Sequence, residues 1–180
     1  MKKLLIVILI IIAGIGIWYF TSGKSNSNTI NTVSTTTSHP NASNATFLFD
    51  DGPITLKKGT NEQEVAPGSA LTQETTLTNT IEYGDINGDK KDDAVVVLMQ
   101  TSGGSGVFIY LAGYVSGPVN YKGTNAVFIG DRIEPKSISI KNNIITLNYL
   151  DRQPNEPFSS KPTVSINQQF VYKNGELVKK

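Results

Sequence analysis

A polar loop that leads directly into an apolar run is the feature that most constrains this chain. Residues 84–93 read Gly-Asp-Ile-Asn-Gly-Asp-Lys-Lys-Asp-Asp, and residues 94–98 follow as Ala-Val-Val-Val-Leu. A short apolar run rich in β-branched residues, bounded by turn residues, is typical of a buried strand. We therefore expect the loop to lie at the end of a core strand.

The same loop has the spacing of a calcium loop. Calcium prefers about six to eight oxygen ligands, which such loops supply from Asp or Asn at alternate positions and from one backbone carbonyl. Val96 stands where an EF-hand requires a bidentate Glu, so the loop is not an EF-hand. The alternative is a solvated turn in which Asp and Asn side chains cap their own backbone. The predicted Ca²⁺ ligands are the carbonyl of Lys91 and the side chains of Asp85, Asn87, Asp89 and Asp93.

Residues 1–20 predict a transmembrane signal anchor. Lys2 and Lys3 precede an unbroken apolar run over residues 4–20. At about 1.5 Å per residue this run reaches roughly 25 Å as a helix, close to the hydrocarbon core of about 30 Å. The positive-inside rule leaves the lysines in the cytoplasm and places the rest of the chain outside, attached to the cell membrane by a single pass. The alternative is a signal peptide cleaved near residues 21–23, Thr-Ser-Gly.

Composition divides the remainder into a tether and a domain. Residues 21–43 consist mostly of Ser, Thr and Asn, with Ile30 and Val33 as the only large aliphatic residues. Such a segment buries too little apolar surface to offset the entropy of ordering, so we expect a disordered tether. Residues 44–180 have the length of one extracytoplasmic domain. The chain has no cysteine, which excludes disulfides, thiolate metal sites and a lipoprotein anchor.

The domain has a β pattern almost throughout. No window combines a convincing helical period with capping residues, so we expect an all-β fold, an antiparallel sheet or sandwich with hairpins. Asn142-Asn143 and Asn174-Gly175 each stand between two β-patterned arms and predict tight turns with positive φ. The predicted strands cover residues 46–49, 54–57, 75–83, 94–99, 107–115, 126–129, 137–140, 144–150 and 164–172.

Charge and histidine content exclude several classes of function. The whole chain carries a net charge of +1. Because Lys2, Lys3 and Lys24 precede the domain and all 15 acidic residues lie within it, the domain has 13 basic and 15 acidic residues, a net charge of −2. That balance lacks the basic stripe of a nucleic-acid-binding protein. The single histidine, His39, falls in the predicted tether, so we expect no catalytic triad and no histidine zinc site in the domain.

Several blocks of the sequence resemble a domain of uncharacterised function found in exported bacterial proteins and lipoproteins. The blocks are the Asp-rich loop with its strand, Ser102-Gly-Gly-Ser-Gly with the run to Ala112, Ala126-Val-Phe-Ile-Gly-Asp-Arg-Ile, and Asn148-Tyr-Leu-Asp-Arg. The Asp loop is separately similar to the calcium loops of FG-GAP and dockerin repeats, which implies metal at the same five residues. Those repeats usually have Gly at position 6, where this chain has Lys90.

These observations together predict a membrane-anchored extracytoplasmic binding or structural domain of the bacterial cell envelope, without enzymatic activity. The expected partners are the membrane, through residues 4–20, and an envelope protein or polysaccharide. The alternative is an envelope hydrolase that uses two carboxylates about 5 to 10 Å apart, one of them with a raised pKa. Its candidate acids are Asp50, Asp51, Glu82 and Asp151.

Overall fold

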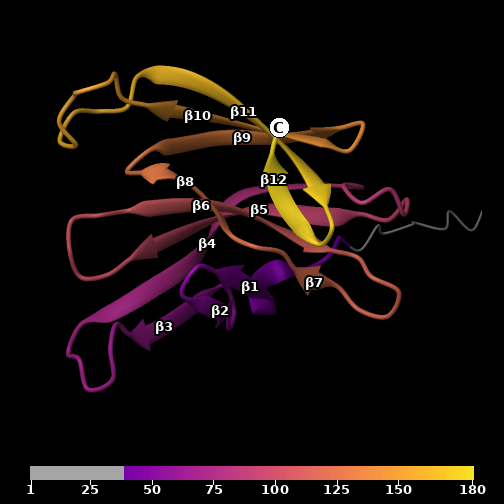
Figure 1. The fold of residues 1–180 in the computed structure, drawn as a ribbon, viewed down its shortest axis with the longest axis horizontal. Coiled ribbons are helices and arrows are strands. Elements are labelled where there is room, and N and C mark those ends of the chain that lie inside the picture. Colours follow the sequence, from indigo (N-terminus) through magenta and orange to yellow (C-terminus); the bar gives the residue numbers. More distant parts are fainter. Residues whose placement is uncertain (1–38) are drawn as a thin grey trace, which may run out of the picture. The chain divides into compact units, whose positions relative to one another are not determined.

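The computed structural model describes residues 39–180, which form an all-β domain with a single 3-10 turn (Figure 1). The predicted anchor and most of the predicted tether lie outside the described residues. Within residues 39–180 no helix is long and apolar enough to cross a membrane. The elements are η1 (Ala42–Asn44), β1 (Thr46–Phe49), β2 (Gly52–Thr55), β3 (Thr60–Glu64), β4 (Thr72–Gly84), β5 (Asp93–Thr101), β6 (Phe108–Val115), β7 (Lys122–Gly123), β8 (Val127–Asp131), β9 (Glu134–Lys141), β10 (Ile144–Asp151), β11 (Val164–Lys173) and β12 (Glu176–Lys179).

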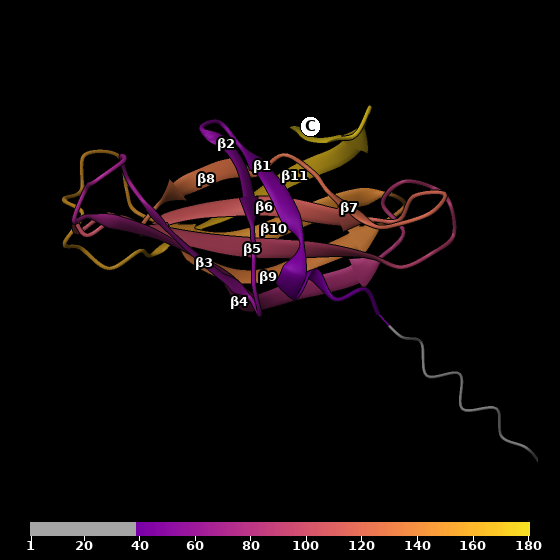
Figure 2. The same ribbon diagram turned by 90° about the horizontal axis from the view of Figure 1, so that it is seen from below.

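Three antiparallel sheets make up the domain. The central sheet has the order β3-β4-β5-β6-β7, with β8 also paired to β6. A second sheet has the order β12-β11-β10-β9, and β1 and β2 form a hairpin of their own. Figure 1 shows the central sheet between the other two, and Figure 2 shows the hairpin crossing the strands of the central sheet at a steep angle. The predicted all-β, antiparallel fold is confirmed, and the two facing sheets give it the form of a sandwich.

Strand β5 is buried on both faces and divides the core in two. Val95 and Val97 face the second sheet, where they pack in a cluster with Ile145, Leu147 and Phe170. The intervening residues Ala94, Val96 and Leu98 face the hairpin and pack in a second cluster with Phe47 and Leu56. This double burial explains why the run from Ala94 to Leu98 is apolar at every position instead of alternating.

The two predicted hairpin turns are present. Asn142 and Asn143 connect β9 to β10 with φ angles of 52° and 60°, and Asn174 and Gly175 connect β11 to β12 with 55° and 92°. All nine predicted strands overlap observed ones. The sequence analysis did not predict β3 or β7, and it included β12 only as the second arm of the hairpin at Asn174-Gly175. Strand β3 is polar throughout and lies at a sheet edge, and β7 has two residues, so neither carries an apolar period.

The folded structure includes residues that the sequence analysis assigned to the tether. Pro40 and Ala42 are buried, although the predicted boundary stands at residues 43 and 44. His39 stacks on Tyr83, with ring centroids 4.3 Å apart, and its Nδ1 lies 3.0 Å from Asp92 Oδ2. The assignment of His39 to the tether is therefore corrected, because this histidine packs on the folded domain. Composition missed this segment because its contacts are made with distant residues.

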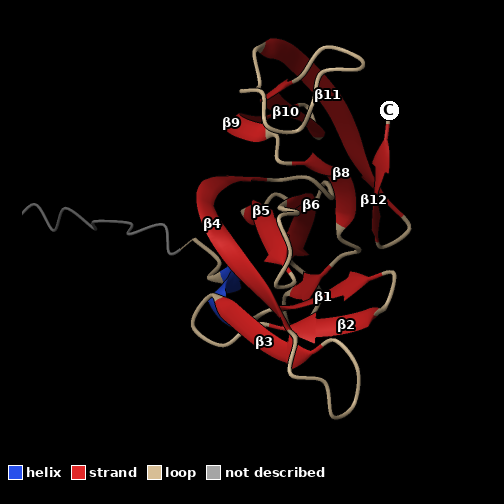
Figure 3. Ribbon diagram, turned by 90° about the vertical axis from the view of Figure 1, so that its left-hand side faces the viewer, coloured by secondary structure: helices blue, strands red, loops and turns tan. Residues whose placement is uncertain are grey.

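The hairpin can approach the central sheet because position 123 is glycine. A Cβ atom built on Gly123 would overlap the backbone carbonyl oxygen of Thr46 and lie 2.9 Å from Phe47 Cδ1. These neighbours are backbone and a buried ring, so neither can move aside at low cost. End-on, Figure 3 shows β1 and β2 beneath the central sheet.

Gly123→Ala should therefore destabilise the domain by about 1–3 kcal/mol, through loss of the close contact between β1 and β7. Gly104→Ala is the matched control, because a Cβ there has no atom within 4 Å. Urea unfolding of the two variants measures the difference. Equal stability would show that the hairpin is not held in this position.

Candidate functional site

The predicted calcium loop connects β4 to β5 and is anchored by Asp93. This residue is fully buried, and its two carboxylate oxygens accept hydrogen bonds from the backbone N–H groups of Ile86 (2.9 Å) and Ser116 (2.8 Å). Ile86 in turn packs in the core between the two large sheets. Asp93 thus joins the start of the loop to the segment that follows β6.

Ser116 is the second link between the loop and that segment. Its hydroxyl donates to Asp89 Oδ2 at 2.6 Å, and Asn87 Nδ2 donates to the Ser116 carbonyl at 3.0 Å. The Ser116 hydroxyl, followed by the backbone N–H of Lys91, holds the pKa of Asp89 below its ordinary value. The aspartate therefore stays ionised at neutral pH and acts as an acceptor within the protein.

Asp85 caps the turn of its own loop. Its Oδ1 accepts from the Gly88 N–H at 2.6 Å, and its Oδ2 accepts from the Lys90 N–H at 2.9 Å. Lys90 has a φ of 66°, the left-handed conformation that calcium-loop repeats usually assign to glycine at this position. For a residue other than glycine that conformation costs about 1 kcal/mol or more.

The five predicted ligands all lie in this one loop, but the side-chain oxygens of the four Asp and Asn residues among them already accept hydrogen bonds. Each carboxylate oxygen of Asp85, Asp89 and Asp93 accepts a hydrogen bond from the protein, as does Asn87 Oδ1. Among residues 39–180, no three His, Cys, Asp or Glu side chains are placed to hold a metal ion. The arrangement fits the self-capped turn, in which these oxygens complete the loop by accepting hydrogen bonds from the protein.

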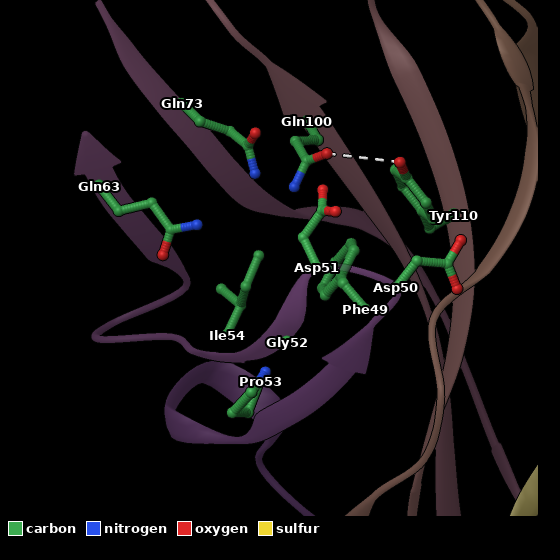
Figure 4. A pocket seen from close by; sticks show the side chains of 10 residues that line it. All are labelled: Phe49, Asp50, Asp51, Gly52, Pro53, Ile54, Gln63, Gln73, Gln100 and Tyr110. Atoms are coloured by element: carbon green, nitrogen blue, oxygen red, sulfur yellow. Dashed lines mark hydrogen bonds between the residues drawn. The ribbon is translucent and has the colours of Figure 1, made fainter. Parts of the chain in front are cut away.

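A different site lies where the turn of the β1–β2 hairpin meets the central sheet. Figure 4 shows a pocket with a volume of about 160 Å³ at this position. Asp50 and Asp51, on the hairpin turn, form one wall and are exposed. The residues lining the pocket are Phe49, Asp50, Asp51, Gly52, Pro53, Ile54, Gln63, Gln73, Gln100 and Tyr110.

Gln100 is the fixed polar group in the pocket. Only 7% of its surface is exposed. Its Nε2 donates to Thr75 Oγ1 at 3.2 Å, and its Oε1 accepts from the Tyr110 hydroxyl at 3.3 Å. A primary amide has two N–H donors, so one N–H of Gln100 is left over for a ligand. In Figure 4 the Asp51 side chain points toward this amide.

Tyr110 links the pocket to a strip of aromatic rings. Burial first, and then the negative charges of Asp50 and Asp51, raise the pKa of Tyr110, so its hydroxyl stays protonated and can donate. Its ring makes edge contacts with Phe49 (4.9 Å between centroids) and with Phe128 (5.5 Å).

Phe108, on the same face of β6, extends this aromatic strip, with its ring centroid 6.3 Å from that of Phe128. Phe128 is 47% exposed, so the strip is accessible to a ligand at that point.

The β1–β2 hairpin separates this strip from a second aromatic pair. Tyr114, two positions beyond Ala112 on the same face of β6, stacks on Tyr121 with ring centroids 5.3 Å apart. The two tyrosines line a hollow of about 450 Å³ together with Leu48 and Lys122. The Tyr121 hydroxyl donates to the Asp92 carbonyl at 2.9 Å, which fixes its ring.

The sequence analysis found part of this site and missed the rest. Asp50 and Asp51 were candidate acids, whereas Glu82 and Asp151, on β4 and β10, do not line the pocket. The signal that could have been read is the alternation of Phe108, Tyr110 and Tyr114 along β6. The amide groups gave no signal, because Gln63, Gln73 and Gln100 meet only in the folded chain.

No family model, curated protein or solved structure was found to match this chain. The site is therefore interpreted from its own chemistry.

Asp93→Ala should cost about 2–5 kcal/mol of unfolding free energy. It removes two hydrogen bonds to a charged group and leaves two backbone N–H donors without an acceptor. Asp93→Asn should cost less, because its amide oxygen still accepts one bond. Asp85→Ala is the control in the same loop, with an expected cost of about 1 kcal/mol. Chemical denaturation ranks the three, and equal costs for both alanine variants would contradict the anchoring role of Asp93.

Calcium binding remains a prediction of the sequence that a melting experiment decides. Since the loop is closed by its own hydrogen bonds and no three of its acids are grouped for a metal within residues 39–180, we expect the same midpoint in about 1 mM Ca²⁺, about 1 mM Mg²⁺ and a chelator. A weak site of the extracellular type would instead add roughly 0.4–1.4 kcal/mol, a shift of a few degrees. A calcium-specific rise that Asp85→Ala abolishes would show that the loop rearranges around the ion.

Proposed function

We propose that this chain is a membrane-anchored extracytoplasmic binding protein of the bacterial cell envelope, and that its ligand is a hydroxyl-rich polymer, a polysaccharide. The observation that carries the proposal is the aromatic strip that leads into a pocket of carboxylates and amides. The apolar run over residues 4–20 behind Lys2 and Lys3 supports the anchoring and the orientation. The resemblance to exported bacterial domains supports the same compartment.

The chemistry of the site suits sugar rings. A sugar ring presents C–H groups on its faces and hydroxyl groups at its rim. Partly exposed aromatic rings such as Phe128 offer a flat apolar surface on which the C–H faces of a sugar can pack. Carboxylates accept hydrogen bonds from hydroxyls, and the amides of Gln63, Gln73 and Gln100 both donate and accept. A pocket of about 160 Å³ is small beside the roughly 300–1,000 Å³ of drug-sized sites, so it suits one sugar unit of a longer chain.

Binding accounts for the site better than hydrolysis. A glycoside hydrolase with two carboxylates needs one of them protonated, which requires a raised pKa. Its two carboxylates also flank the scissile bond, whereas Asp50 and Asp51 are neighbours on one turn and form one wall of the pocket. The hydrolase stays the second candidate because Asp50 and Asp51 share one pocket.

Phe128→Ala should weaken binding to insoluble envelope polysaccharide about two- to tenfold, since one aromatic contact contributes roughly 0.5–1.5 kcal/mol. Phe158→Ala is the matched control: Phe158 is also exposed, at 56%, but it contacts the guanidinium group of Arg132 and does not line the pocket. Sedimentation of the full-length chain with the polymer measures both. Equal binding by the two variants would overturn the proposal, and release of new reducing ends would favour the hydrolase.

A further inference from the structure

We infer that the sugar unit in the pocket carries a protonated amine, so that the ligand class is an amino sugar with a free amino group. The inference rests on the proposed function and specifies the charge of its ligand. Its basis is the placement of Asp50 and Asp51 at one side of the pocket, with no cationic group in the lining.

Among residues 39–180 the two carboxylates of the hairpin turn have no partner of opposite charge. The ion pairs of residues 39–180 involve Asp89, Asp92, Asp131 and Glu134, and none includes Asp50 or Asp51. The pocket lining contains no Lys, Arg or His. Two adjacent like charges repel each other, and a ligand cation between them relieves that repulsion.

The negative charge is directed into the site. Asp50 and Asp51 contribute, after burial, to the raised pKa of Tyr110, so their field reaches the aromatic wall. The ring of Tyr110 can itself attract a cation held within about 6 Å of its face. A phosphate or uronic acid would meet two carboxylates and no compensating base, so anionic polymers are disfavoured.

The remaining groups of the pocket suit the hydroxyls of the same sugar unit. Gln100 is held by Thr75 and Tyr110, so its spare N–H donor has a fixed direction. Gln63 and Gln73 stand across the pocket on β3 and β4 (Figure 4). A fixed donor recognises a hydroxyl oxygen, and the carboxylates are left for the ammonium group. The pocket thus divides its neutral and charged contacts between two parts of one ligand.

A metal ion is a weaker match for this pocket. Within the described range no three His, Cys, Asp or Glu side chains are grouped for a metal, and a hard divalent cation favours about six to eight oxygens. An ammonium group has three N–H donors, which two carboxylates and one further oxygen can satisfy. The chelator in the experiment below removes the metal alternative.

The test compares three oligosaccharides of equal length against the full-length chain by calorimetry, with a chelator present. The probes are oligomers of glucosamine, of N-acetylglucosamine and of glucose. We expect the glucosamine oligomer to bind about tenfold or more tightly than the other two. We also expect that advantage to disappear at about 1 M salt, where the screening length is roughly 3 Å.

Two double variants locate the effect. Asp50→Asn with Asp51→Asn should remove the preference for glucosamine while leaving the affinity for the neutral oligomers within about twofold. Glu62→Gln with Glu64→Gln is the matched control on the adjacent strand β3, where both acids are exposed and outside the pocket lining. That control should keep the preference, and thermal melting of both checks that each is folded.

The outcomes separate the inference from the proposed function. Equal binding of all three oligomers, unaffected by salt or by the Asp50 and Asp51 variant, overturns the amine and leaves polysaccharide binding intact. A glucosamine preference that both double variants lose overturns the assignment to this pocket, because it reflects overall charge. Failure of every oligomer, together with no effect of Phe128→Ala on the polymer, overturns both.

Discussion

The burial of β5 on both faces is the constraint on which the rest of the domain depends. Every residue from Ala94 to Leu98 is fully buried, so a layer must cover each side of this strand. Sheet β12-β11-β10-β9 covers one side, and the β1–β2 hairpin with its 3-10 turn covers the other. The two-stranded hairpin covers less of the central sheet than the four-stranded sheet does, so part of the central sheet beside the hairpin is accessible. The pocket forms at that margin.

A polar anchor complements this apolar centre at the point where β5 begins. Asp93 is buried and bonded to two backbone N–H groups, and Ser116 joins the same loop to the end of β6. These bonds hold together three segments distant in sequence. The Asp-rich loop therefore contributes to the fold through its own hydrogen bonds, and we propose the pocket beside the hairpin as the ligand site.

The hairpin also organises the aromatic side chains of β6. Phe108, Tyr110 and Tyr114 share one face of this strand, and the small residue Ala112 lies between them in the core beneath the hairpin. The aromatic strip and the acid–amide pocket thus lie on one side of the hairpin, and the stacked pair of Tyr114 and Tyr121 lies on the other. A single strand presents two aromatic surfaces because another element crosses it.

The amino-acid sequence by itself determined the strands that carry an apolar pattern, the Asn-containing turns and the all-β class, since period-two patterning and positive-φ residues act over a few neighbouring positions. It also placed the Asp loop at the end of a core strand. Only the tertiary structure decided that His39 packs on Tyr83, that every carboxylate oxygen of Asp85, Asp89 and Asp93 accepts a hydrogen bond, and that Asp51 faces Gln100. The hairpin reaches its place through contacts such as the bridge between Leu48 and Asn125. Leu48 and Asn125 are far apart in the sequence, so no local pattern predicts their contact. The contact forms because burying both faces of β5 at once places the hairpin against the central sheet.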